Sequence, residues 1–315
     1  QFSRLDEAVA ALKRIKANLK RYKASVLKAA VEGKLTEEWR KENCRGEAVP
    51  RPKIVNGKDR ATHRIAPTES GADLLKRVLT ERRKKWEKEH PGKKYKETAK
   101  PDTSNLPELP KGWVWARLDS IAEIKGGITV DKKRVVPNSK NIAYLRVANV
   151  QRGYLDLSEI KEIQASAADI KALRLRHGDI LFNEGGDRDK LGRGWIWEDQ
   201  IPECIHQNHV FRARLILPEM SSKLISWWGN TFGKNYFLRE GKQTTNLASV
   251  NLTKLSAFPV PLPSLLEQQL ITEEIERLLS VSEEIELEIE TNLKRAERLR
   301  QSILNKAFSG RLVQQ

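Results

Sequence analysis

The chain has 315 residues, of which 39% are hydrophobic and 32% are charged, enough apolar material for a core with a heavily charged remainder. It has no apolar run of about 18 residues, which argues against a membrane-spanning helix, and its N-terminus lacks the features of a signal peptide. The net charge of +16, with 28 Lys and Arg against 14 Asp and Glu in residues 1–100, favours a polyanionic partner such as nucleic acid.

The first predicted element is a long amphipathic helix from Phe2 to about Gly33, within a first segment of residues 1–42. Apolar residues from Leu5 to Ala30 recur at spacings of three, four or seven, and Gly33 suits a C-cap. Since the chain does not begin with Met, we expect it to be processed or to be a piece of a longer protein.

Residues 43–110 form a looser segment that is rich in Pro, Gly and Lys. Inside it, Asp73 to about His90 is predicted to be a short, very basic helix, and a Pro-rich linker that ends in LPELPKG follows. The helix either lies along phosphate or is a solvated surface helix. Its most basic run is Arg82, Arg83, Lys84 and Lys85.

Residues 111–264 have the pattern of a mixed α/β domain. Short apolar runs between Trp113 and about Pro263 are broken by Gly, Asn and Asp. Four tryptophans occur in pairs two residues apart, and we expect their rings in the domain core rather than stacked on bases. They are Trp113, Trp115, Trp195 and Trp197, and Trp227 and Trp228 are expected to pack a helix onto the same core.

Residues 265–315 are predicted to contain a long helix, from Leu265 to about Phe308. Its apolar residues keep a heptad pattern, with Ser282 and Asn292 at polar breaks. A helix of this length would extend roughly 65 Å. The apolar positions are Ile271, Ile275, Leu278, Ile285, Ile289, Ala296, Leu299 and Ile303.

An internal repeat relates the two helical segments. Residues Tyr22–Leu35 (YKASVLKAAVEGKL) align without gaps with Leu299–Leu312 (LRQSILNKAFSGRL), with five identical positions. Chance agreement between two amphipathic helices is the alternative, but the shared stop of Gly, a basic residue and Leu favours duplication. The sequence therefore predicts an α+β fold, in which one mixed α/β domain is flanked by two long helices that form an antiparallel coiled coil.

The sequence carries no recognisable cofactor or metal motif. It has no G-x-x-x-x-G-K-[ST] phosphate loop and no G-x-G-x-x-G run. Cys44 and Cys204 lack a metal-binding spacing, which suits a reducing cytoplasm, and the pair His206 and His209 has no further ligand at a suitable spacing. Asp187–Lys190 is more typical of a solvated loop than of a nuclease site. We expect no catalysis, no bound cofactor and no metal.

Four ordered blocks within residues 106–312 resemble the specificity subunits of Type I restriction–modification systems. Leu106–Gly127 resembles the opening of a target recognition domain, and Tyr144–Leu157 resembles the strand–turn–strand that follows. Leu175–Leu215 is similar to the middle of such domains, and Gln243–Ile271 to their exit into a spacer helix. The first helix resembles the central spacer of such a subunit.

The resemblance implies a non-catalytic subunit that recognises duplex DNA. Family members usually carry two recognition domains and two spacers, and this chain has one domain between two spacer segments. It is then a natural half-subunit, which would self-associate, or the C-terminal half of a longer protein. Expected partners are methyltransferase subunits, two per complex, which bring S-adenosylmethionine, and restriction subunits where the system has them.

Four groups of residues are candidate DNA contacts within this domain. Arg and Lys suit guanine edges or phosphate, and Gln and Asn suit adenine. The groups are Arg188, Lys190 and Arg193 in a glycine-bracketed loop; His206, Gln207, Asn208 and His209; Gln243, Thr244, Thr245 and Asn246; and Arg146 and Asn149.

Each group also has an ordinary structural interpretation. The loop could be a surface hairpin, the run from His206 could satisfy buried backbone groups, and the run from Gln243 could cap a turn. Arg146 and Asn149 are three apart on one predicted strand, so at most one is expected to face DNA.

Two other functions are compatible with this organisation. The chain could be a fragment of a fused restriction and methyltransferase enzyme, or a coiled-coil adaptor with a protein-binding head. DNA binding that becomes sequence-selective only with a methyltransferase partner would separate the specificity subunit from both. The sequence does not predict which DNA sequence is recognised.

Overall fold

The computed structural model describes residues 2–43, 69–131, 138–186, 191–240, 242–243 and 248–309. The chain divides into two compact units, one of Gln1–Ala30 and Glu273–Gln315 and the other of Val31–Thr272. We call them the helical unit and the sheet unit. None of the described helices is long and apolar enough to cross a membrane.

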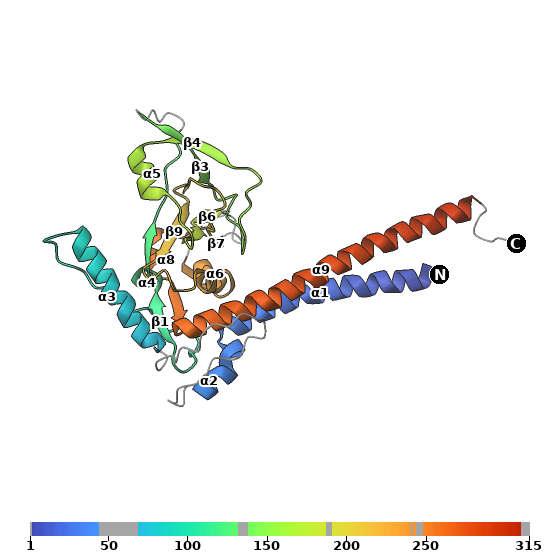
Figure 1. The fold of residues 1–315 in the computed structure, drawn as a ribbon, viewed down its shortest axis with the longest axis horizontal. Coiled ribbons are helices and arrows are strands. Elements are labelled where there is room, and N and C mark those ends of the chain that lie inside the picture. Colours follow the sequence, from blue (N-terminus) through green and yellow to red (C-terminus); the bar gives the residue numbers. More distant parts are fainter. Residues whose placement is uncertain are drawn as a thin grey trace, which may run out of the picture. The chain divides into compact units, whose positions relative to one another are not determined.

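The helical unit consists of most of α1 (Phe2–Val31) and most of α9 (Leu265–Phe308), which run side by side (Figure 1). Asp6 pairs with Arg300 at 3.1 Å, Lys16 with Glu290 at 2.6 Å and Lys23 with Glu286 at 2.7 Å. Residue numbers rise along α1 while those of the partners fall along α9. The predicted antiparallel coiled coil is confirmed.

The inward face of α9 differs from the predicted heptad in its middle. Ser282 and Ile289, seven residues apart, are buried, whereas Ile285 is 38% and Leu299 50% exposed. Glu286, the residue after Ile285, faces α1 through its ion pair with Lys23. The predicted seam is thus buried at Ser282 and Ile289, whereas Ile285 and Leu299 are more exposed than it predicts.

The described residues of the sheet unit form four small sheets. A four-stranded antiparallel sheet has the order β2 (Ala122–Lys125), β9 (Val210–Leu215), β5 (Ile180–Asn183) and β7 (Gly194–Ile196). A second has the order β4 (Lys161–Ala165), β3 (Lys140–Leu145) and β8 (Cys204–His206), with β3 and β8 parallel. A third joins β10 (Lys242–Gln243), β11 (Ala248–Ser249) and β6 (Gly185–Gly186), and β1 (Val114–Arg117) pairs with β12 (Pro259–Leu262).

Where the structure describes it, the sheet unit also has eight shorter helices. They are η1 (Lys34–Thr36), α2 (Glu37–Asn43), α3 (Gly71–Glu89), α4 (Leu118–Ile121), α5 (Ala167–Leu173), α6 (Ser222–Thr231), α7 (Gly233–Glu240) and α8 (Leu252–Ser256). Ser70, Ser166, Ser221 and Asn251 begin four of them, and each side chain accepts a backbone N–H from the first turn. Such caps satisfy donors that a helix start leaves free.

The four-stranded sheet separates two hydrophobic clusters because side chains alternate along a strand. On β9, Phe211 and Ala213 pack in the larger cluster, and Val210 packs in the smaller one with Leu181 and Trp197. The prediction that the tryptophans belong to the core is confirmed, since Trp113, Trp197, Trp227 and Trp228 are buried and Trp115 and Trp195 pack against the larger cluster.

A buried polar network lies at the base of the sheet unit, which we define as η1, α2, Trp113 and the first turns of α9. Glu267 accepts hydrogen bonds from Thr36 Oγ1 at 2.7 Å and from Trp113 Nε1 at 2.8 Å, and it forms an ion pair with Arg40. The Arg40 guanidinium also lies over the Trp113 ring, 5.7 Å from its centre. The carboxylate of Glu267 therefore joins three segments that are distant in sequence.

Gly33 makes this base possible. It has a φ of +71°, the left-handed conformation that lets the chain turn from α1 into η1. A Cβ atom there would lie 2.7 Å from Cγ of Pro110 and 3.1 Å from the Trp113 ring. The predicted helix stop at Gly33 is confirmed, because α1 ends at Val31.

Candidate nucleic-acid interface

Segments that are distant in sequence meet where β5 ends and β9 begins. Gln207 N donates to Leu145 O at 2.9 Å, and Glu184 N donates to His209 O at 2.9 Å. Asn183 Nδ2 donates to Val147 O and Val150 O. We call this region the loop edge; its described residues are 146–154, 183–186, 191–194, 207–209, 242–243 and 248–250. All four groups of candidate DNA contacts come from it or from residues that continue from it in the chain.

The run from His206 to His209 divides into a buried end and an exposed end. His206 is fully buried on β8, where Nδ1 lies 2.6 Å from Val210 O. A carbonyl oxygen only accepts, so Nδ1 carries the hydrogen and donates. Burial lowers the pKa of His206 to about 4, which keeps the ring neutral. His206, a predicted DNA contact, is therefore not accessible to a ligand in this structure.

The other three residues of the run are accessible. Gln207 and Asn208 are half-buried and His209 is exposed. His209 Nδ1 lies 2.5 Å from Glu184 Oε2, across the junction between the ends of β5 and β9. These side chains can offer donors and acceptors to a ligand outside the domain.

Arg146 and Asn149 lie in the turn after β3, not on the strand as predicted. Asn149 is 3% exposed; its Oδ1 accepts from Arg146 N, and its Nδ2 donates to Asp156 O and Glu159 O, all at 2.9 Å. Asn149, also a predicted DNA contact, is therefore not accessible in this structure, where its amide holds the turn together. Arg146 is partly exposed and ion-pairs with Glu159 at 3.3 Å.

The glycine-bracketed segment is fixed at its described end. Arg193 is half-buried and Nη2 donates to Val147 O at 3.3 Å. The Asn230 side chain accepts from Gly194 N at 3.1 Å and donates to Gly194 O at 2.7 Å. A Cβ atom on Gly194 would lie 1.9 Å from Leu181 O, so only glycine fits there. Arg188 and Lys190 lie outside the described residues.

The run from Gln243 reaches the same edge through backbone pairing. Gln243 pairs with Ala248 between β10 and β11, and Ala248 pairs with Gly186 of β6. Thr244, Thr245 and Asn246 lie outside the described residues. The backbone at Gln243 is thus two strands from the glycine-bracketed segment.

Three further residues of the loop edge were missed from the sequence. Glu184 holds His209, and Arg152 Nη1 donates to Asn230 O at 2.7 Å. Tyr154 is 56% exposed beside Gly153, whose φ is +84° and whose N donates to Gly194 O at 3.2 Å. The sequence QRGY could have identified Arg152 and Tyr154, because these two residues flank a turn glycine.

Neither thiol nor metal chemistry is visible in the part of the chain that the structure describes. No group of three or more His, Cys, Asp or Glu among those residues could hold a metal ion. Burial raises the pKa of the Cys204 thiol to about 12, which makes it a poor nucleophile. The chemistry offered at the loop edge is hydrogen bonding and charge.

Comparison with known proteins places this arrangement in a family. Residues 110–295 match the model of the Type I restriction modification DNA specificity domain. The chain is similar to the EcoKI specificity subunit of Escherichia coli strain K12, with 25% identity over 199 residues, which are 62% of this chain and 42% of that one. It is similar to the EcoDI specificity subunit of Escherichia coli, with 24% identity over 322 residues, which are 99% of this chain and 58% of that one.

A solved structure has the same fold. A chain from work on the structural basis of complex assembly and conformational transition of the type I R-M system superimposes with a TM-score of 0.51 and 16% identity, over 77% of this chain and 54% of that one. The chain thus spans about half the length of the relatives that it matches. Because the family model covers more than half of its residues, the chain belongs to the family of Type I restriction–modification DNA specificity domains.

Proposed function

We propose that the chain is a non-catalytic subunit, or part of one, that recognises a DNA sequence and directs methyltransferase and restriction subunits of a Type I complex to it. The observation that carries this proposal is the convergence of separate polar segments on the loop edge, away from the closed base. Sequence recognition needs several side chains from a rigid scaffold aimed at one groove, which one loop alone rarely supplies.

The accessible residues of the loop edge suit groove chemistry. Gln207 and Asn208 carry amides of the kind that pair with adenine, and Arg193 carries a guanidinium that suits guanine or phosphate. His209 donates or accepts according to its protonation. Arg188, Lys190, Thr244, Thr245 and Asn246 continue from the same edge in the chain and stay proposed contacts, as do Arg146 and Gln243.

We also propose that a second recognition domain docks on the C-terminal end of α9. Val31 is buried in the core of the sheet unit, yet its equivalent in the internal repeat, Phe308, is 89% exposed. Phe308 is exposed to water although its equivalent in the repeat is buried. An exposed apolar residue of this kind suits a docking position that a partner would fill. Another copy of this chain, or another domain of a longer protein, would bind there, so that two DNA half-sites are recognised at a fixed spacing.

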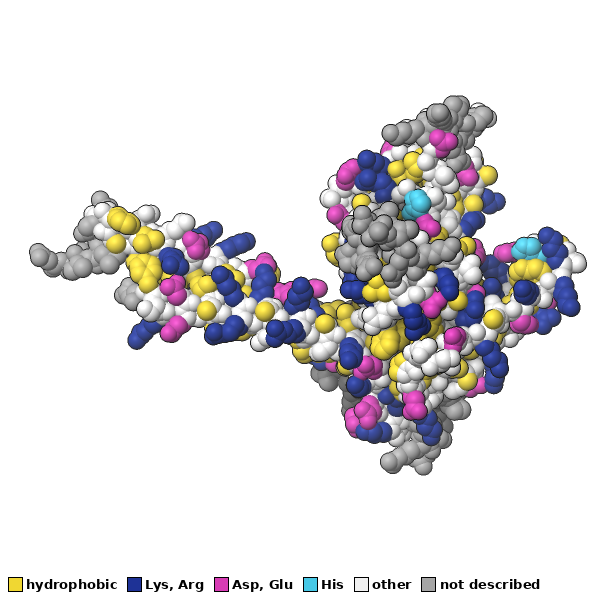
Figure 2. All heavy atoms as spheres, turned by 180° about the vertical axis from the view of Figure 1, so that it is seen from behind, with side chains coloured by type: hydrophobic (Ala, Val, Ile, Leu, Met, Phe, Trp, Pro, Cys, Tyr) yellow, Lys and Arg dark blue, Asp and Glu magenta, His cyan; other side chains and the backbone are white. Residues whose placement is uncertain are grey.

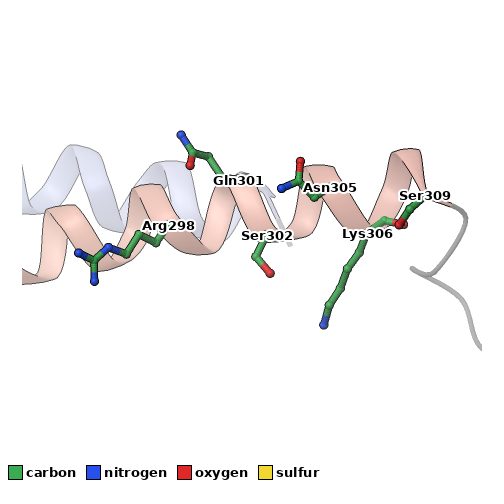
Figure 3. Close-up of a pocket in the computed structure, with 6 residues that line it drawn as sticks. All are labelled: Arg298, Gln301, Ser302, Asn305, Lys306 and Ser309. Atoms are coloured by element: carbon green, nitrogen blue, oxygen red, sulfur yellow. The ribbon is translucent and has the colours of Figure 1, made fainter.

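A shallow pocket on the same stretch of α9 offers no alternative small-molecule site. It is lined by Arg298, Gln301, Ser302, Asn305, Lys306 and Ser309. Figure 3 shows that these side chains spread along a single helix and do not converge on a common point. A specific ligand site needs convergent polar groups in an enclosing surface, so this open face suits a protein partner better.

The proposal is tested by selection. The full chain, co-expressed with methyltransferase subunits, is incubated with a pool of random-sequence duplexes, and bound duplexes are sequenced after several rounds. We expect one bipartite sequence to be enriched, and the same sequence to be methylated in the DNA of the expression host. A complex that binds duplexes without enrichment would contradict the proposal.

A separate measurement tests the absence of chemistry. We expect the purified chain alone to show no methylation or cleavage of DNA with S-adenosylmethionine, ATP and magnesium, because its sequence has no cofactor motif. Turnover by the chain freed of partner subunits would overturn this part of the proposal.

A further inference from the structure

The second half of α3 and the segment after it form an ordered projection of the sheet unit, which we call the arm (residues 81–100). The first half of α3 is anchored, because Leu74 and Val78 are fully buried in the larger hydrophobic cluster. Gly71 N also donates to Gly112 O at 2.8 Å. From residue 81 to residue 100 no described residue is buried, and Figure 1 shows this part of α3 and the following segment at the side of the sheets.

Aromatic contacts hold the arm together. Trp86 stacks on His90 with ring centres 4.7 Å apart, and Tyr95 meets the edge of Trp86 at 5.4 Å. The Arg83 guanidinium lies 5.8 Å from the Tyr95 ring centre and pairs with Glu87 at 2.8 Å. These contacts fold the returning segment against the helix, so the arm has a defined shape without a hydrophobic core of its own.

The arm carries a large excess of positive charge. Its nine basic residues face four acidic ones: the bases are Arg82, Arg83, Lys84, Lys85, Lys88, Lys93, Lys94, Lys96 and Lys100, and the acids are Glu81, Glu87, Glu89 and Glu97. Lys84 pairs with Glu81, and Lys85 with Glu123 of β2. Within the described part of the chain, none of Lys88, Lys93, Lys94 and Lys96 forms an ion pair.

The kind of partner follows from what the arm lacks. Protein interfaces have an apolar centre, and no large hydrophobic side chain of the arm is among the exposed ones. Figure 2 shows Lys and Arg side chains over the far end of α3. Ordered lysines around a turn, between which Trp86 and Tyr95 are only partly exposed, suit a polyanion whose charges are regularly spaced.

We propose that the arm binds the phosphate backbone of duplex DNA beside the sequence that the loop edge recognises. This inference rests on the proposed function, since it takes duplex DNA as the ligand of the same unit. The arm lies before residue 110, where the family match begins, and its contact would be independent of sequence. Lysine ammonium groups bind phosphates as point charges and carry no base specificity.

The test compares two charge-matched variants of the full chain. In the arm variant, Lys88, Lys93, Lys94 and Lys96 are replaced by Gln; in the control, the exposed Lys13, Arg14, Lys20 and Arg21 of α1 are replaced by Gln. Binding to a labelled 40-base-pair random-sequence duplex is measured by fluorescence anisotropy between 50 and 250 mM KCl. Thermal melting confirms that both variants fold.

We expect the arm variant to bind more weakly at low salt, with the slope of log affinity against log salt reduced by about 0.9 for each phosphate that the arm no longer neutralises. The control should keep the parent slope, and the sequence preference of both should match the parent. A parent slope in the arm variant would overturn the proposal. So would unchanged DNA binding with weakened binding of methyltransferase subunits, which would make the arm a protein-binding surface.

The two proposals fail separately. If the parent enriches a sequence and the arm variant keeps the parent slope, only the arm proposal fails. If the parent enriches no sequence but its salt slope depends on the four lysines, the proposed recognition function fails and the arm proposal stands.

Discussion

The base and the loop edge of the sheet unit handle buried polar groups in opposite ways. At the base, the Glu267 carboxylate accepts from Thr36, Trp113 and Arg40, and Gln268 accepts from Ser221 N at 2.9 Å. At the loop edge and beside it, Asn183 Oδ1, Arg146 Nε and His206 Nε2 are buried and have no hydrogen-bond partner among the described residues. Such groups cost free energy of folding, and native proteins keep them mainly where function requires it.

The contrast suggests that the two regions have different roles. The polar groups of the base are paired because they hold helices in place, whereas the loop edge, the proposed ligand-binding region, keeps polar groups without partners among the described residues. Stability should therefore respond to changes at the base, and DNA binding to changes at the edge.

The largest expected effect is at the base. Replacing Glu267 by Ala leaves the Arg40 guanidinium, 11% exposed, without its carboxylate. We expect the free energy of unfolding to fall by about 3–5 kcal/mol, as when one partner of a buried ion pair is removed. Urea denaturation followed by circular dichroism measures it. The matched control is Glu290→Ala, whose pair with Lys16 is about half exposed and should change stability by less than about 1 kcal/mol. Equal losses of unfolding free energy in Glu267→Ala and Glu290→Ala would contradict the stabilising role of the base.

A second effect concerns His206 and pH. Its pKa is lowered from 6.5 to about 4 by burial, so the unfolded chain binds a proton that the folded one does not. Its contribution to stability is full above pH 6.5 and is lost as the pH falls toward 4, by about 3 kcal/mol. We expect His206→Gln to have a flatter dependence of unfolding free energy on pH over this range. Parallel curves for the parent and His206→Gln would contradict the assignment.

A third effect separates binding from stability at the edge. We expect His209→Ala, in the assembled complex, to weaken binding to the selected duplex by about 1–3 kcal/mol if its ring contacts a base. Binding to random duplex should change less, and the melting temperature should stay near that of the parent. Lys161→Ala, an exposed cation of β4, is the control. A lower melting temperature with unchanged selectivity would show that His209 has a structural role and does not contact DNA.

The smallest expected effect is at Arg193. Its guanidinium is half-buried against Val147 O, so Arg193→Ala should affect both the stability of the domain and its binding to DNA. If Arg193 contacts phosphate, Arg193→Ala should weaken cognate and random duplexes alike and lower the salt slope by roughly one. If it contacts a base, the loss should be larger on the cognate duplex. Binding that equals the parent on both duplexes across salt would remove Arg193 from the proposed contacts.

The helices were predictable because their signals are local. The heptad pattern predicted α9 at its observed bounds, and Gly33 predicted the end of α1. The repeat added the antiparallel pairing. The heptad pattern overestimated the burial of Ile285 and Leu299, because periodicity shows which face of a helix is apolar and not how closely its partner covers that face.

The site was predictable as a set of segments but not residue by residue. Polar runs between apolar strands predicted segments that the structure brings together at the loop edge, yet polarity does not reveal burial. Asn149 is buried because its amide bonds Asp156 O and Glu159 O, and His206 because it ends β8, which pairs in parallel with β3 across some sixty residues. No local pattern encodes these contacts. Glu184 was missed for the same reason, since its partner His209 lies in the turn before β9.

The pairing of β1 with β12 has a consequence for how such proteins diversify. Val114 faces Leu262 in this ladder, so the chain enters and leaves the domain at neighbouring positions. A segment whose two ends are adjacent can be exchanged for another of the same design without altering the helices on either side. Recombination at these two strands would transfer the whole loop edge, and with it the proposed base contacts, in one event. New specificity would then arise by replacing a cassette rather than by gradual substitution at the loop edge.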